Sequence, residues 1–186
     1  MPIKINLGCG DDIRPKSEGW INVDKQKMSG VDAICDIETG LPFADDFADF
    51  ILMSHVLEHT FKPMKVLHDV HRVLKPDGIL KIIVPHMDAP STWHLNHHHF
   101  FNEYSLNGLF KPSCRTSRGV LFKLLDLKIE RSMFIPFPRC KLVPSGLITV
   151  NDSLRKLFGI NLNIGTKREI IWVLKKVKRN DAKKIK

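Results

Sequence analysis

Short apolar runs, separated by polar segments that contain glycine or proline, recur along this 186-residue chain. Their length and composition predict strands at residues 4–7, 20–23, 32–35, 50–54, 79–84, 127–132 and 169–174. Between Pro63 and Leu74 the apolar positions recur at helical spacing, and the polar sequence at 75–78 supplies a stop, so a helix is expected there. Further helices are expected to start near Ser105 and to span about 152–158.

This alternation of strands and helices is typical of an α/β sheet with helices on its faces. Right-handed crossovers would bring the carboxyl ends of the early strands to one edge of the sheet, and with them Gly8, Asp24, Asp36 and Ser54. That edge is the predicted active site. Residues 11–19 are fewer than a parallel crossover normally needs, so the first helix should be short or absent.

The residues at this edge predict a nucleoside-binding site. Gly8 and Gly10 follow the first strand, where glycine lets a ligand approach the backbone, and Asp24 ends the second strand, where a carboxylate can accept hydrogen bonds from a ribose diol. Two carboxylates follow Gly10, which argues against a phosphate-binding loop, and Ile13 replaces the third glycine of a dinucleotide fingerprint. A ribosylated cofactor with a positive centre and no phosphate, such as S-adenosylmethionine, fits this pattern.

Several motifs in a fixed order carry a resemblance to a known family. They are Leu7-Gly8-Cys9-Gly10, Asp24, Cys35-Asp36-Ile37, residues 41–51, His55-Val56-Leu57-Glu58-His59 and residues 72–78. The set resembles the class I, Rossmann-like S-adenosylmethionine-dependent methyltransferases, and within them the methyltransferase type 11 family. The resemblance implies a doubly wound, mostly parallel seven-stranded sheet whose last strand runs antiparallel.

The resemblance also implies which residues hold S-adenosylmethionine. They lie at the ends of the first four strands and are Gly8, Cys9, Gly10, Asp24, Asp36, Ile37, Ser54 and His55. The glycine turn would pass under the ribose and methionine, Asp24 would accept both ribose hydroxyls, and Asp36 would contact the adenine amino group beside Ile37. Ser54 and His55 would lie near the methionine. Glu58 and His59 have two open interpretations, a structural one at the following helix or loop and a functional one.

Methyl transfer requires an acceptor held in line with the methyl group and, for an oxygen or protonated nitrogen, a base. Five of the nine histidines fall within residues 86–99. The candidates there for base or acceptor positioning are His86, Asp88, His97 and His98. His94 could instead share a helix face with His97 or His98 as metal ligands, but no further ligand pair closes the shell, so no metal is predicted. A third interpretation is that these imidazoles pack and hydrogen-bond locally.

Composition favours one domain. At 43% apolar residues the chain can bury a single core, so residues 1–178 are predicted to form one methyltransferase domain, with 134–166 as a lid or a homodimer interface and 179–186 as a disordered basic tail. A strand is predicted within a few residues of Met1 and no apolar run reaches about 18 residues, so neither a signal peptide nor a membrane span is expected. The four cysteines lack Cys-x-x-Cys spacing, which favours a reducing, cytoplasmic location.

The net charge of +9 favours anionic partners. The predicted acceptor is a small molecule, and the positive field would suit an acidic or phosphorylated one. An RNA methyltransferase is the first alternative, motivated by the basic surface, although no RNA-binding module is recognisable. The second is a cofactor-binding protein without transfer activity. No membrane partner is expected.

Overall fold

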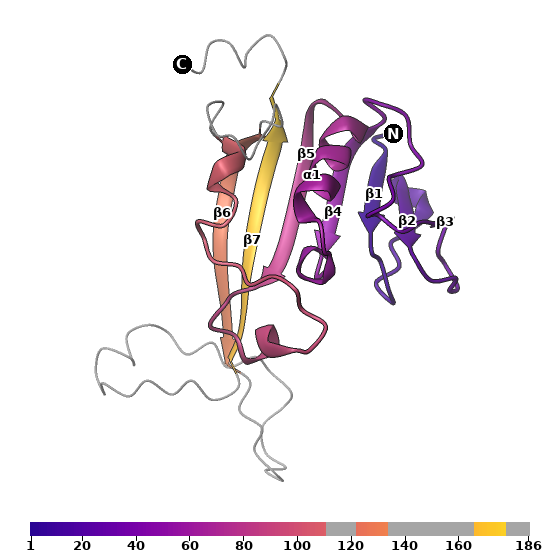
Figure 1. Cartoon of the computed structure of the whole chain (residues 1–186). Coiled ribbons are helices and arrows are strands. Elements are labelled where there is room, and N and C mark those ends of the chain that lie inside the picture. Colours follow the sequence, from indigo (N-terminus) through magenta and orange to yellow (C-terminus); the bar gives the residue numbers. More distant parts are fainter. Residues whose placement is uncertain (111–121, 134–165, 178–186) are drawn as a thin grey trace, which may run out of the picture.

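The computed structural model describes residues 1–110, 122–133 and 166–177. Its seven-stranded sheet has the order β3-β2-β1-β4-β5-β7-β6 (Figure 1). The strands are β1 (Lys4–Leu7), β2 (Trp20–Asp24), β3 (Ala33–Ile34), β4 (Ala48–Ser54), β5 (Leu74–Pro85), β6 (Phe122–Met133) and β7 (Thr166–Lys176). β1 to β5 pair in parallel, and β7 pairs antiparallel with both β5 and β6. The predicted Rossmann-like, mostly parallel sheet with an antiparallel last strand is confirmed.

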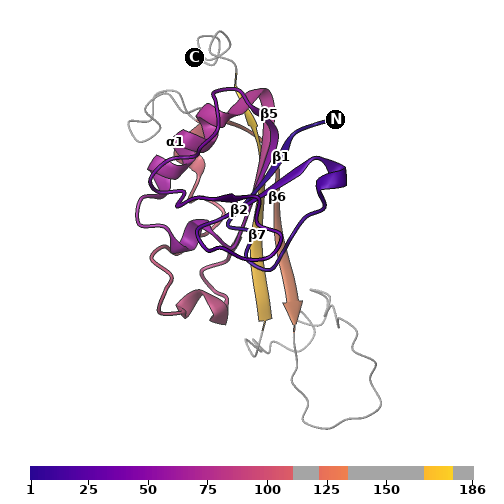
Figure 2. The same cartoon turned by 90° about the vertical axis from the view of Figure 1, so that its right-hand side faces the viewer.

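The core forms where the buried faces of the strands meet helix α1 (Pro63–Val73). Pro63 suits the start of this helix, because its fixed φ is helical and its missing N–H would have no partner there. Val66, Leu67, Val70 and Val73 form the buried stripe of α1, which lies on one side of the sheet (Figure 2). α1 is the only α-helix within the described ranges.

The junction between α1 and β5 differs from the prediction. Leu74 was expected to end the helix, but it begins β5, and the strand was expected to start at Ile79. Between these positions Asp77 has a φ of +70°, and the pairing with β4 jumps from Leu74 to Ile79. Residues 75–78 therefore form an irregularity within β5, as a bulge does when extra residues lack partners.

The first crossover helix is replaced by a short 3₁₀-helix, η1 (Lys16–Glu18), as the length of the connection predicted. Two buried asparagines, Asn6 of β1 and Asn22 of β2, hold the rest of this connection. The Asn6 Nδ2 donates to the Asp12 carbonyl at 2.7 Å. The Asn22 side chain accepts from the Arg14 N–H at 2.9 Å and donates to the Arg14 carbonyl at 2.8 Å. Side-chain amides thus satisfy backbone groups that a helix would have satisfied internally.

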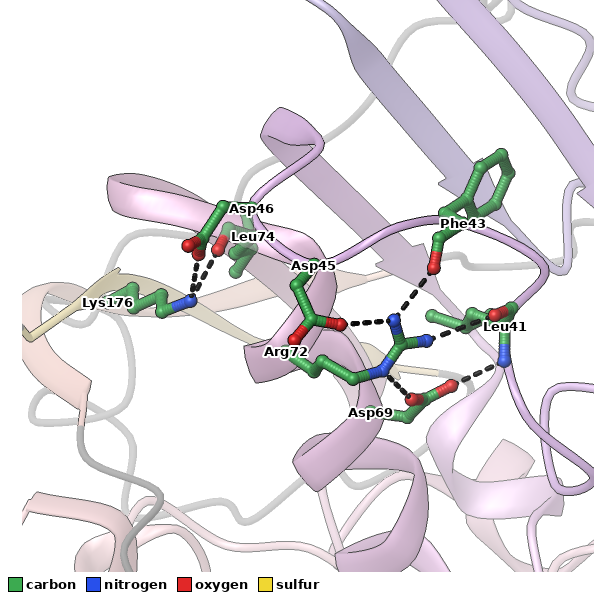
Figure 3. Close-up of polar contacts among 8 residues, drawn as sticks. All are labelled: Leu41, Phe43, Asp45, Asp46, Asp69, Arg72, Leu74 and Lys176. Atoms are coloured by element: carbon green, nitrogen blue, oxygen red, sulfur yellow. Dashed lines mark hydrogen bonds and ion pairs between the residues drawn. The ribbon is translucent and has the colours of Figure 1, made fainter.

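Side-chain hydrogen bonds of Arg72 hold residues 41–45 against α1 (Figure 3). The guanidinium donates to Asp69 at 2.7 Å, to Asp45 at 2.9 Å, and to the carbonyl oxygens of Phe43 at 2.7 Å and Leu41 at 3.1 Å. The Leu41 N–H donates in turn to Asp69. Arg72 therefore orders a connection that has no regular structure of its own.

The helix expected near Ser105 is wrong in type. The chain forms turns at 103–106 and then a 3₁₀-helix, η4 (Asn107–Phe110). The Asn102 side chain accepts from the Tyr104 N–H at 3.0 Å, and such local bonds compete with an α-helix. The predicted helix at 152–158, the tail at 179–186 and all but the last residue of the insertion at 134–166 lie outside the described residues. No helix of the described part is long and apolar enough to cross a membrane.

Candidate active site

A cavity of about 480 Å³ opens at the edge of the sheet where β1, β2 and β4 end. Five of the residues predicted to bind a cofactor line it: Gly8, Asp24, Asp36, Ile37 and His55. Cys9, Gly10 and Ser54 lie within two residues of these positions in sequence but do not line the cavity. The Cys9 side chain is buried, and this burial raises the pKa of its thiol.

The glycine turn after β1 requires glycine for two reasons at Gly8. Its φ is +64°, and a Cβ built there would lie 2.5 Å from Cγ2 of Val56. Gly10 has a φ of +47°, and a Cβ built there would have none of the described residues, apart from its chain neighbours, within 4 Å. The Gly10 N–H donates to Oδ2 of Asp24 at 2.9 Å, and the Gln26 N–H donates to Oδ1 at 2.9 Å. Each carboxylate oxygen has a second lone pair, so Asp24 is oriented and can still accept from a ligand.

Asp36 and Ile37 follow β3 and lie in a turn. Oδ1 of Asp36 accepts from the Glu38 N–H at 2.9 Å, which fixes the carboxylate at the cavity wall. Ile37 is partly buried against the core, while Phe61, which also lines the cavity, is 69% exposed. The wall therefore combines a carboxylate with apolar surface, the mixture typical of small-molecule sites.

His55 directly follows β4 and has a φ of +55°, a left-handed conformation that is uncommon outside glycine. Its Nε2 lies 2.9 Å from Oε1 of Glu169 in β7, and its Nδ1 lies 3.3 Å from Oε1 of Glu58. The hydrogen bond to Glu169 first, and then the interaction with the Glu58 carboxylate, raise the pKa of His55 to about 9, against an opposing effect of burial. His55 is therefore an imidazolium at neutral pH and cannot act there as a base.

The structure separates the four catalytic candidates. His98 lines the cavity, and its ring stacks on Phe61 with a centroid distance of 3.9 Å. His97 packs against the ring of His59 at 4.6 Å. Burial, and then the neighbouring His59, lower the pKa of His97, so its neutral form is favoured.

His86 and Asp88 belong to a different network, which does not line this cavity. Nδ1 of His86 lies 3.6 Å from Asp88, and its Nε2 lies 3.5 Å from Glu103. Asp88 also accepts from the Arg168 guanidinium of β7 at 2.9 Å. This network ties residues 86–88 to the antiparallel strand.

Sequence reasoning missed part of the cavity wall. These residues are Lys25, Cys35, Glu38, Thr60, Phe61 and Asn96. Most of them directly adjoin predicted site residues, so adjacency to the motifs was the available signal. Glu58 and His59, left between two interpretations, are now placed: the Glu58 side chain is fully buried and His59 lines the cavity.

Residues 15–82 match the family model described as a methyltransferase domain, of type 11. This match confirms the resemblance over that segment, and the glycine turn at 8–10 precedes it. Over 75 residues the chain is 35% identical to the demethylmenaquinone methyltransferase of Renibacterium salmoninarum, a match that covers 40% of the chain and 31% of that protein. The chain thus matches less than a third of the length of this relative.

Solved structures share the fold over nearly the whole chain. A SAM-dependent methyltransferase from Archaeoglobus fulgidus superposes with a TM-score of 0.61 at 18% identity, covering 94% of this chain and 86% of that one. The 1,6-didemethyltoxoflavin-N1-methyltransferase of Burkholderia thailandensis, solved with its substrate and S-adenosylhomocysteine, gives a TM-score of 0.58 at 16% identity, covering 95% and 72%. At these identities the likeness establishes the fold.

Proposed function

We propose that this chain, which shares the methyltransferase domain family over residues 15–82 and the fold of S-adenosylmethionine-dependent methyltransferases, is itself such an enzyme. It would transfer the methyl group of S-adenosylmethionine to an oxygen or nitrogen of a small-molecule acceptor. The observation that carries the proposal is Asp24, whose two oxygens are oriented by backbone N–H groups at the wall of a cavity beside a glycine turn.

The residues present fit this cofactor. Gly8 lines the cavity and would bring the backbone of the glycine turn close to the ligand. Asp24 would accept the ribose hydroxyls, and Asp36 with Ile37 would hold the adenine. The imidazolium of His55 would attract the carboxylate of the methionine moiety. When bound, the cofactor supplies a methyl group on a sulfonium that is already a good leaving group.

The chain's own residues would then position the acceptor and take its proton. Of the four catalytic candidates, His98 is the one on the cavity wall, so we assign the base to His98. Its ring orientation is held by the stack on Phe61. His86 and Asp88 would position the acceptor-side loop through Arg168 rather than remove a proton.

The acceptor proposed is a small molecule because the nitrogen methyltransferase from Burkholderia and the demethylmenaquinone methyltransferase from Renibacterium, by their names, act on small molecules. The charge of +9 supports an anionic acceptor. A cytoplasmic location is part of the proposal, supported by the free thiols of Cys9 and Cys35. The homodimer contact through 134–166 stays a prediction.

The first test is a thermal shift of the full chain with S-adenosylhomocysteine, with NAD and ATP as control ligands. At about a hundred times its dissociation constant the ligand should add about 2.7 kcal/mol of stability, a rise of several degrees in melting temperature. The Asp24→Asn variant should lose most of this rise in melting temperature. The amide oxygen of asparagine can accept hydrogen bonds, but its NH₂ group cannot replace the second carboxylate oxygen as an acceptor. Asp11→Asn, a neighbouring carboxylate outside the cavity, should keep it.

If Asp24→Asn keeps the full thermal shift, Asp24 is not the ribose anchor. If the wild-type protein, freed of copurified ligand, shows no shift with S-adenosylhomocysteine, the proposed cofactor is wrong. Release of S-adenosylhomocysteine from S-adenosylmethionine, measured across phenols, amines and organic acids with an RNA arm, then tests transfer. Turnover with RNA alone would overturn the small-molecule acceptor. Binding without turnover in any arm would favour a cofactor-binding protein.

A further inference from the structure

A second constellation lies against the wall of the cavity. It joins Glu58 and His59 of the 3₁₀-helix η2 (Leu57–His59) to His97, which follows the 3₁₀-helix η3 (Pro90–Trp93). One donor atom from each of the three side chains lies within 4.8 Å of the other two. The two segments are far apart in sequence, so the fold alone creates this grouping.

The hydrogen bonds of the two histidines fix which nitrogen is free. Nδ1 of His59 lies 3.0 Å from the Asn96 carbonyl oxygen, and Nδ1 of His97 lies 3.0 Å from the Thr92 carbonyl oxygen. A carbonyl can only accept, so each Nδ1 carries the hydrogen, and in the neutral imidazoles each Nε2 presents a lone pair. Metal-ligating histidines are held in the same way, with the second ring nitrogen donating to a backbone carbonyl or carboxylate.

The third member is a buried carboxylate that lacks hydrogen bonds. The Glu58 side chain is fully buried, and within the described residues neither oxygen has a hydrogen-bond partner. Oε1 has an ion pair with Nδ1 of His55 at 3.3 Å. Oε2 of Glu58 has no hydrogen-bond partner within the described residues, so this oxygen is the one available to a bound cation. Burying a carboxylate is costly unless cations or donors meet its oxygens, and the ion pair with His55 engages Oε1.

We propose that Glu58, His59 and His97 form a binding site for a divalent transition-metal ion, with Zn²⁺ as the reference ion. Imidazole nitrogen with one carboxylate is a donor set that suits zinc and iron-group ions rather than magnesium or calcium. Metal–ligand distances of about 2.0–2.2 Å place donors roughly 3–4 Å apart, so binding would draw the three groups together by about an ångström. Three protein ligands leave further positions for water or a bound oxygen, and because His59 lines the cavity these would lie at its wall.

The prediction of no metal rested on the histidines of residues 86–99 alone. Within that segment His94, His97 and His98 lack a partner that completes a shell. The missing ligands come instead from the turn after β4, and the sequence did not indicate that this turn packs against the histidine segment. The contact is direct, because the His98 N–H donates to the Glu58 carbonyl oxygen at 2.8 Å.

The test is calorimetric titration of the full, chelator-treated chain with Zn²⁺, in a buffer that does not bind metal. We expect one tight site per chain. Glu58→Gln and His97→Gln each remove one ligand while keeping the side chain's approximate size, and each should weaken that site at least about tenfold. His68→Gln, a histidine of α1 outside the constellation, should leave the affinity within about twofold. Thermal melting of each metal-free variant controls for folding.

Co²⁺ provides a second readout that surface histidines do not mimic. Bound to this donor set it should give visible absorption that saturates at one ion per chain and is lost in His97→Gln. Absence of a tight Zn²⁺ site in the wild-type chain, or equal affinity in wild type and both ligand variants, would overturn the proposal. No cofactor is present in these measurements, so their failure leaves the S-adenosylhomocysteine result untouched, and the reverse also holds.

Discussion

At the scale of single residues, the turn after β1 is shaped by a contact as well as by backbone conformation. Gly8 combines a positive φ with a neighbour, Val56, that occupies the space a side chain would need. Gly10 shares the positive φ, but apart from its chain neighbours no other atom of the described part of the chain lies within 4 Å of the position of a Cβ. A substitution at Gly10 therefore reports the cost of the backbone conformation, whereas one at Gly8 reports that cost together with the steric overlap.

We expect Gly8→Ala to destabilise the fold by more than Gly10→Ala. Left-handed backbone costs an alanine about 1–2 kcal/mol at either position, and Gly8→Ala adds the overlap with Val56. The double variant Gly8→Ala/Val56→Ala removes the two methyl groups nearest the new Cβ, so in a double-mutant cycle by urea unfolding the two changes should couple favourably. Strictly additive effects would show that the clash relaxes at no cost.

At the scale of elements, the sequence predicted the strands well where burial controls them. β1, β2 and β4 follow apolar runs, and the count of residues 11–19 correctly excluded a full first helix. One miss arises from a side chain that bonds to the backbone, and the other from an irregularity of the backbone itself. Asn102 forms a local turn where a helix start was expected, and the polar stop after α1 was absorbed into an irregular β5. Such competition is invisible to periodicity, because it depends on where a side-chain oxygen points.

The prediction at the scale of elements concerns Arg72, which joins α1 to residues 41–45. Arg72→Lys should lower the free energy of unfolding by about 1–3 kcal/mol, because a single ammonium cannot reach two carbonyls and two carboxylates in the planar arrangement of the guanidinium. The matched control is Arg14→Lys, the same change at an exposed pair with Asp12, and it should have a much smaller effect. If both variants lose the same free energy of unfolding in urea, the hydrogen bonds of Arg72 to residues 41–45 stabilise the fold no more than an exposed ion pair does.

At the scale of the whole molecule, the candidate site divides into a part that chain order predicts and a part that it does not. Gly8, Asp24 and Asp36 lie at, or just after, the carboxyl ends of neighbouring parallel strands. Because these strand ends meet at one edge of the sheet, chain order alone places the three residues together. His55 with Glu169, and His59 with His97, meet because β7 returns antiparallel and the histidine segment folds back over η2. No spacing in the sequence encodes contacts between segments so far apart.

The contact of His55 with Glu169 makes stability depend on pH. The pKa of His55 is raised from 6.5 to about 9 in the folded state, chiefly by Glu169, so the folded chain binds this proton more tightly than the unfolded chain. The stabilisation is fully present below about pH 6.5 and is lost as pH rises through about 9. In urea unfolding with a chelator present, Glu169→Gln should flatten this decline, and NMR should show the pKa of His55 moving down toward 6.5. Glu103→Gln, a carboxylate beside His86, should keep the wild-type slope. An unchanged slope in Glu169→Gln would mean that the edge of the cavity does not depend on β7 for its charge.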